Sequence, residues 1–160
     1  MSLVQAALLV LAALAADEKK NELVARAERT EFLIASKPAS RVEKDAEGNV
    51  LRLRLDGMAL SADEFAALAR LTALKHLTLN RTNVTAADLR KLHTLVRLET
   101  LQLNVTELGD DATGELIGFP VLRSVCLGNV AVSPEAIERM KAQFQAAERR
   151  FAVGYSPKRR

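Results

Sequence analysis

A nucleophilic dyad would have to join a nucleophile, Ser124 or Cys126, to a general base, His76 or His93. A nucleophile and its general base must approach to roughly 3 Å. The strands predicted below place His76 and Cys126 two strands apart and two residues out of step, so their backbones stand about 12 Å apart. Ser124 is level with His76, but Thr100 lies between them, and His93 falls in a helical segment. The spacing therefore argues against a Cys–His or Ser–His dyad.

Metal and cofactor chemistry finds no better support in the sequence. The histidines and the single cysteine lack the spacing of a metal site, and no glycine-rich phosphate loop follows a predicted strand. The carboxylates of the predicted helices lie on solvated faces. We therefore expect a protein that is not an enzyme and that needs no cofactor and no metal.

A cluster of cations is the remaining candidate for a binding site. Outward positions of the predicted strands and their exits carry five cations against two carboxylates (Arg52, Arg54, Lys75, Arg81 and Arg123 against Asp56 and Glu99). Like charges on neighbouring strands repel, so packing gives no reason to gather them. Arginine suits bidentate contacts with carboxylates, and a histidine adds charge below about pH 6.5. The hypothesis is an acidic partner bound by Arg52, Arg54, Lys75, His76 and Arg81; ordinary solvated surface is the alternative.

A constant step along the chain organises the elements that position these side chains. Four aliphatic columns recur at a step of about 24 residues, and a fixed period of 20–29 residues is typical of a leucine-rich repeat solenoid. We expect an α/β fold with four parallel strand-and-helix repeats, in which residues 53 and 55 and their equivalents point inward. The columns are Val50, Leu74, Leu98 and Leu122; Leu53, Leu77, Leu101 and Val125; Leu55, Leu79, Leu103 and Leu127; and Leu60, Val84, Leu108 and Val132.

The second half of each repeat should be a short helix. Ser61, Thr85 and Ser133 are good helix N-caps, and Ser61 belongs to a predicted capping box. The third repeat is irregular, because Gly114 and Gly118 lie in its helical half. Each interior glycine costs a helix roughly 1 kcal/mol relative to alanine. This segment is either a hinge or binding loop, or a tolerated irregular turn.

Capping elements are predicted on both sides of the repeats. Residues 17–36 contain no Gly or Pro and have one apolar face, which predicts an N-terminal capping helix; binding of a partner by this helix is the alternative. Residues 40–55 predict a hairpin with its turn at 45–49. The predicted domains are an N-terminal cap over 17–49, repeats over 50–148 with the last serving as a C-terminal helical cap, and a solvated basic tail over 149–160.

The uncharged run over residues 2–16 ends in Ala13-Leu14-Ala15-Ala16 and meets a charged segment. That pattern predicts a signal peptide over 1–16, and the run is too short to span a membrane. No Lys or Arg precedes it, so a helix continuous with the next segment is the alternative. We expect export to the periplasm or beyond, with the cytoplasm as the alternative.

One segment carries a family resemblance. Thr82–Leu89 (TNVTAADL) resembles the T-x-V-T-D-A-G-L segment of short-repeat bacterial leucine-rich repeat proteins. The resemblance covers essentially the whole chain and implies a protein-interaction module without assigning a role. The family usually has Asn or Cys at one position of the turn, and this chain has other residues there. Of these, threonine can form a hydrogen bond with a backbone group of the turn, whereas methionine and valine cannot. The replacing residues are Met58, Thr82, Thr106 and Val130.

Composition limits the function only broadly. Of 160 residues, 49% are apolar, 4% are aromatic and the net charge is +3. The scarcity of aromatic residues argues against a rich aromatic recognition face, and the mild charge argues against a nucleic-acid partner. We expect a monomer that presents a small repeat surface to a protein. Alternatives are a structural unit that docks by its ends or capping helix, and a cytosolic adaptor if the N-terminal run is not a signal peptide.

Overall fold

The structure is a computed structural model that describes residues 14–15, 17–26 and 42–158. The predicted signal peptide therefore lies almost wholly outside the described residues, as does the second half of the predicted capping helix. Residues 17–26 are helical. The elements that follow are β1 (Val42–Lys44), β2 (Val50–Arg54), α2 (Ala62–Leu68), β3 (His76–Thr78), α3 (Ala86–Lys91), the 3-10 turn η1 (Leu92–Thr94), β4 (Thr100–Gln102), α4 (Asp111–Ile117), β5 (Ser124–Val130), α5 (Pro134–Ala146) and β6 (Ala152–Pro157).

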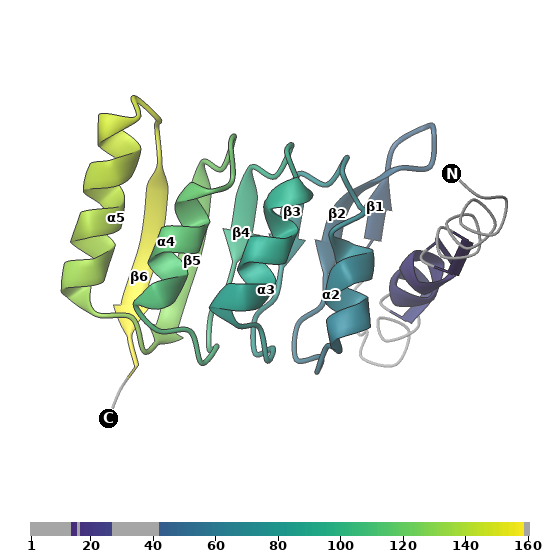
Figure 1. Cartoon of the computed structure of the whole chain (residues 1–160), viewed down its shortest axis with the longest axis horizontal. Helices are drawn as coiled ribbons and strands as arrows, with labels where there is room; N and C mark the ends of the chain where they lie inside the picture. Colours follow the sequence, from purple (N-terminus) through teal and green to yellow (C-terminus); the bar gives the residue numbers. More distant parts are fainter. Residues whose placement is uncertain (1–13, 16, 27–41, 159–160) are drawn as a thin grey trace, which may run out of the picture.

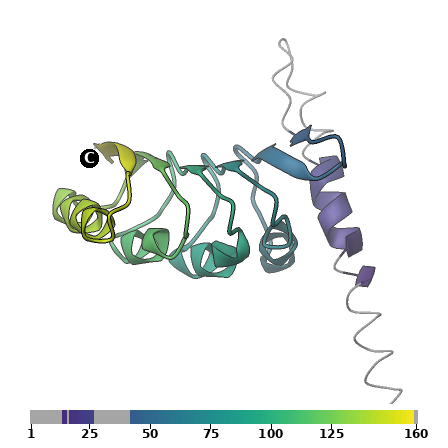
Figure 2. The same ribbon diagram turned by 90° about the horizontal axis from the view of Figure 1, so that it is seen from above.

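The six strands form one open sheet in the order β1-β2-β3-β4-β5-β6, which matches their order in the chain (Figure 1). β1 pairs with β2 in an antiparallel hairpin, as predicted, and the other neighbours are all parallel. Helices α2 to α5 lie on one face of the sheet, and no helix covers the other face in the part of the chain that the structure describes (Figure 2). The predicted α/β class is thus confirmed, with a mostly parallel sheet.

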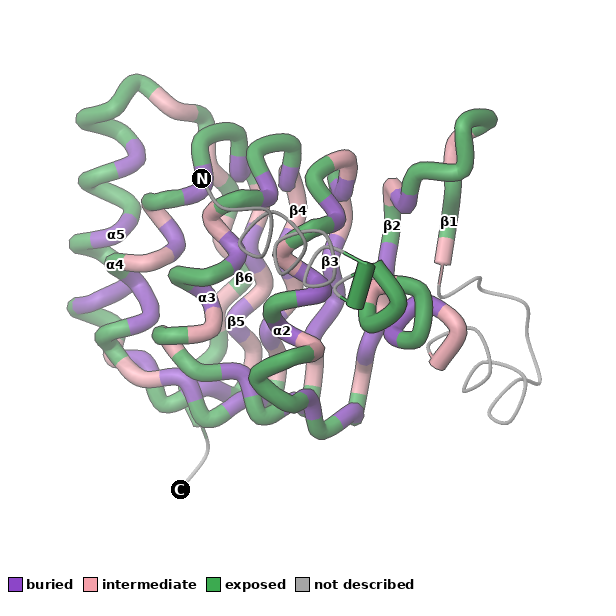
Figure 3. Tube along the Cα trace, turned by 45° about the vertical axis from the view of Figure 1, so that its right-hand side comes forward, coloured by how far each residue is buried: buried purple, intermediate pink, exposed green. Residues whose placement is uncertain are grey.

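The constant step of the sequence is visible in the register of the parallel strands. Arg52, His76, Thr100 and Ser124 are successive partners across β2 to β5. One residue further, Leu53 and its partners form a row that is buried against the helices. Figure 3 shows how buried residues alternate with more exposed ones along these strands. The aliphatic columns therefore supply the core, as predicted.

The predicted helix caps are also present. Ser61 and Thr85 each take part in a capping box, with Glu64 and Asp88 at the third helical position. Ser133 accepts a hydrogen bond from the amide of α5 residue 136, at 3.2 Å. Helix α4 differs, because its N-cap has no side-chain hydrogen bond. The third segment is the irregular one, as its glycines indicated.

Gly118, at the end of α4, has a packing role. A Cβ atom there would stand 2.3 Å from the ring of His93. That ring lies edge-on to Phe119, with ring centroids 5.0 Å apart, and its Nε2 is 2.7 Å from the carbonyl oxygen of Glu115. The glycine gives the imidazole its space, which favours the interpretation of a structural turn over a binding loop.

The turns at the ends of successive strands share one backbone conformation. Four equivalent positions are left-handed, three of them after β2, β3 and β4 and the fourth near the end of β5, with φ values of 72°, 56°, 59° and 56° (Gly57, Arg81, Val105 and Asn129). The following residue is Thr82 or Thr106 in the central turns. Each threonine hydroxyl donates to a backbone carbonyl, at 2.7 and 2.9 Å. The predicted role of these hydroxyls is confirmed.

A ladder of side chains runs beside these turns. An oxygen of Asp56 accepts from the amide of Asn80 at 3.1 Å, and Asn80 accepts in turn from the amide of Asn104 at 2.8 Å. Asn104 accepts from the amide of Gly128 at 2.7 Å. Each bond ties one strand exit to the next. Gly128 has no side chain that could continue the ladder, and a Cβ there would stand 2.8 Å from the Asn104 oxygen.

The prediction of a solvated basic tail over 149–160 is wrong for most of that segment. Residues 152–157 form β6, which pairs in parallel with β5 along its whole length. The hydroxyl of Tyr155 donates to the carbonyl of Val132 at 2.7 Å, and Phe151 stacks on Phe144 with ring centroids 3.8 Å apart. The C-terminal cap of the sheet is therefore α5 together with a strand, because β5 would otherwise leave its backbone groups unpaired.

Arg149 links the end of α5 to the segment at the end of α4. Glu148 is left-handed (φ 55°), and the amide of Arg149 donates to the carbonyl of Phe144, the Schellman pattern that ends a helix. The guanidinium lies 4.5 Å from the centre of the Phe144 ring. It donates to the carbonyl of Ile117, the last residue of α4, and to those of Phe119 and Leu122, which follow the helix.

The helix over residues 17–26 packs against the other end of the sheet (Figures 1 and 2). Leu23 and Val24 are buried in the common core. Asp17 pairs with Arg70 at 3.2 Å, and a second ion pair joins Arg26 to Glu64. For the described residues, the predicted docking of this amphipathic helix is confirmed.

Candidate functional site

The candidate site is the face of the sheet that no described helix covers. Two rows of outward side chains cross it, and their character changes along the sheet: arginines stand on β2, small residues on β5 and β6. The first row is Arg52, His76, Thr100, Ser124 and Ala152, and the second is Arg54, Thr78, Gln102, Cys126 and Gly154. The face therefore carries charged side chains at the β2 end and small side chains at the β5 and β6 end.

The two arginines of this face already have carboxylate partners. Arg52 donates to Glu43 on β1 at 2.9 Å, and Arg54 donates to Asp56 at 3.3 Å. Both arginines are partly exposed, with side-chain exposures of 47% and 42%, so the pairs are open to solvent and worth little. The sequence interpretation did not count Glu43, because only the hairpin register places it beside Arg52.

His76 stands next to Arg52 in the same row. Burial lowers the pKa of His76 below its ordinary value of 6.5, and the positive charge of Arg52 lowers it further. Glu99 and Glu43 oppose this effect without reversing it. His76 therefore takes up its proton in a more acidic solution than its ordinary pKa would require.

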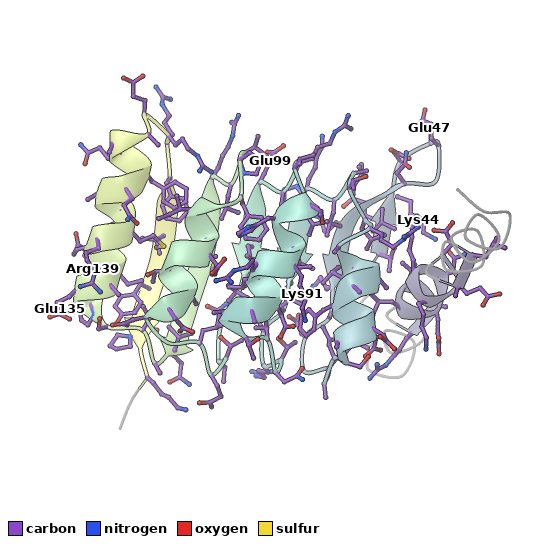
Figure 4. All side chains as sticks on the ribbon, viewed as in Figure 1. Lys44, Glu47, Lys91, Glu99, Glu135 and Arg139 are labelled. Carbon is purple, nitrogen blue, oxygen red and sulfur yellow. The ribbon has the colours of Figure 1, made fainter. Side chains whose placement is uncertain are left out.

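Lys75 and Arg81 do not share this surface. Lys75 precedes β3, at the edge of the sheet where the strands start, and Arg81 lies in the left-handed turn after the strand. Six residues of extended chain place their backbones roughly 20 Å apart. The strand-start edge is the one where Figure 4 labels Glu99 and Glu47. The five predicted binding residues thus fall on one face and two opposite edges.

The structure keeps the nucleophilic side chains apart, as predicted. His76 lies on β3, Ser124 and Cys126 lie on β5, and β4 runs between these two strands. Within residues 14–15, 17–26 and 42–158, no group of three His, Cys, Asp or Glu side chains could hold a metal ion. None of the described helices has the length and apolar character needed to cross a membrane.

Comparison with known protein families and with curated proteins found no family and no individual protein that matches this chain.

Proposed function

We propose that the chain is a leucine-rich repeat solenoid and that it works as a protein-interaction module, with the partner on the open face of the sheet. The constant step through β2, β3, β4 and β5, with a helical segment after each of these strands, supports this repeat architecture. Solenoids of this kind commonly bind partners on an extended sheet surface.

One observation carries the proposal: the sheet is mostly parallel, yet one of its faces is bare of described helices. Parallel sheets are usually covered by helices on both faces. The centre of the bare face holds Thr100, Gln102 and Ser124, which are partly exposed. Their side chains are short or flexible, so another polypeptide can approach the strands closely.

The size of the face limits the affinity. Six strands about 4.8 Å apart and about five residues of length give an area on the order of 400 Å². A standard interface buries roughly 800 Å² on each partner. The partner must therefore also contact the sheet edges, or bind weakly. If it is acidic, it has to displace Glu43 and Asp56 from the two arginines, while Lys75 and Arg81 attract it from the two edges of the sheet.

A photo-crosslinking residue tests the location. Placed at Thr100, it should yield a crosslinked protein from an extract of the source cells; placed at Ala87, which is exposed on α3, it should not. Gln102→Arg, on the same face, should abolish the product at Thr100 without changing the melting temperature. Equal products from Thr100 and Ala87, or a product that survives Gln102→Arg, would place the partner elsewhere.

We also propose that residues 1–16 are a signal peptide and that the module works after export. Their uncharged run and alanine-rich end support this proposal. N-terminal sequencing of protein exported from a bacterial host should then find a chain that begins near Ala16 or Asp17. An intact Met1 or Ser2 on the exported protein would contradict it.

A further inference from the structure

A hollow of about 330 Å³ lies outside the open face, beside the residues that lead into β5 and β6. Three apolar residues and three arginines line it, and its lining contains no carboxylate among the described residues. These residues are Pro120, Val121, Leu122, Arg123, Arg149 and Arg150. The hollow therefore combines an apolar surface with an excess of positive charge.

Arg149 has a structural role in this hollow. Its guanidinium is committed to three backbone carbonyls and to the face of the Phe144 ring. Burial lowers the pKa of Arg149 below its ordinary range. This side chain shapes the wall of the hollow and contributes a charge that is partly withdrawn from solvent.

Arg123 and Arg150 are different, because both are exposed and neither takes part in an ion pair or a side-chain hydrogen bond with the described residues. The chain brings them together: the amide of Ala152 donates to the carbonyl of Arg123 at 2.8 Å, so the two arginines flank neighbouring strands. The carbonyl of Glu99 accepts from the amide of Arg123 at 2.9 Å, yet no ion pair joins the side chains of these two described residues.

The arrangement costs stability, since like charges on neighbouring strands repel. On β2 the fold offsets such charges with Glu43 and Asp56, whereas the described lining of this hollow supplies no carboxylate. A second hollow, of about 440 Å³, adjoins Arg149 and Arg150 on the side of α5. It adds Lys141, already paired with Glu138 at 2.8 Å, and one carboxylate of the described lining, that of Glu148.

We propose that the hollow beside β5 and β6 binds an acidic peptide segment in which an apolar side chain is flanked by carboxylates. The guanidinium groups of Arg123 and Arg150 would hold the carboxylates, a contact for which arginine geometry is suited. The apolar side chain would rest on Val121, which is 40% exposed. This site lies at the strand-start edge and does not depend on a partner for the open face.

The test uses the full chain and a fluorescent peptide that carries a leucine between glutamates. Titration should move the amide resonances of residues 121–123 and 150–152. The double variant Arg123→Gln/Arg150→Gln should weaken binding by at least about tenfold, because each charge-assisted bond is lost. Its melting temperature should not fall and should rise slightly, since neither side chain has a partner among the described residues and the repulsion between the two charges is removed.

Arg139→Gln is the matched control, because it removes an exposed cation of α5 that lines neither hollow, and it should leave the affinity unchanged. Replacing the peptide leucine by serine should also weaken binding. The proposal is overturned if Arg139→Gln weakens binding as much as the double variant, or if the moving resonances lie on the open face. It is also overturned if inorganic phosphate displaces the peptide at equal concentration, which would indicate a simple anion site.

Discussion

Val105 occupies a backbone conformation that its side chain disfavours. Its φ is 59°, and the equivalent turns place Gly57 and Asn129 at this position. A left-handed conformation costs an L-residue roughly 1–2 kcal/mol, whereas glycine and asparagine adopt it more readily. A β-branched residue is a genuine outlier there. The fold therefore contains a strained residue whose relief can be measured.

The expected gain from Val105→Asn follows from two opposing contributions. Relief of the backbone should stabilise the fold by about 1–2 kcal/mol. Full burial of a valine contributes about 1.5 kcal/mol, and Val105 is already 44% exposed, so its loss costs roughly 0.8 kcal/mol. The free energy of unfolding should therefore rise by roughly 0.2–1.2 kcal/mol. For a chain of 160 residues this is a rise of about 2 °C in melting temperature.

Urea unfolding followed by circular dichroism measures this difference, with an unchanged m value as the sign that the unfolded state is the same. Val96→Asn is the matched control, because Val96 is 52% exposed and its φ is not positive. The reciprocal change Asn129→Val should destabilise by about 1 kcal/mol. If Val105→Asn is no more stable than Val96→Asn, the left-handed turn is not a source of strain and the reasoning fails.

Two further predictions concern hydrogen bonds that hold the fold. Gly128→Ala should lower the free energy of unfolding by about 1–3 kcal/mol, because the new Cβ displaces the Asn104 oxygen from the Gly128 amide; the change should be far smaller in an Asn104→Ala background. Burial alone would raise the pKa of Glu64, but the amide of Ser61 and the guanidinium of Arg26 bring it below 4.5. Ionised Glu64 thus stabilises the fold above about pH 4.5, and stability should fall as the pH drops through the lowered pKa, less so in Glu64→Gln.

The core was predictable from the sequence because it depends on side-chain type at a fixed spacing. Leu53 and its equivalents are buried wherever the constant step places them, and Ser61, Thr85 and Ser133 cap helices because their hydroxyls act locally. β6 was missed because it does not keep the step. One more equal step from Ser124 would reach Glu148, whereas the strand partner of Ser124 is Ala152. Val153 and Tyr155 therefore fall outside the aliphatic columns.

The candidate site was harder to predict, because charges act across the sheet. Glu43 neutralises Arg52 only through the hairpin register, which the composition of the strand does not reveal. Lys75 and Arg81 were grouped with Arg52 by their position near strands, although the direction of the side chain at a strand edge depends on the turn. Arg123 and Arg150 lie close together only because β6 pairs with β5, and the pattern of leucines does not predict β6.

The constant register from β2 to β5 makes the length of the sheet adjustable. A second copy of the β3 strand and its following helix, inserted before β4, would put asparagine beside asparagine in the ladder and leucine beside leucine in the core. Both ends of the molecule would keep their contacts. The longer step before β6 has the opposite effect, because a duplication there would meet neither the ladder nor the columns. The sheet can thus be extended between β2 and β5 but not beside β6, so its open face can be widened by one strand at a time.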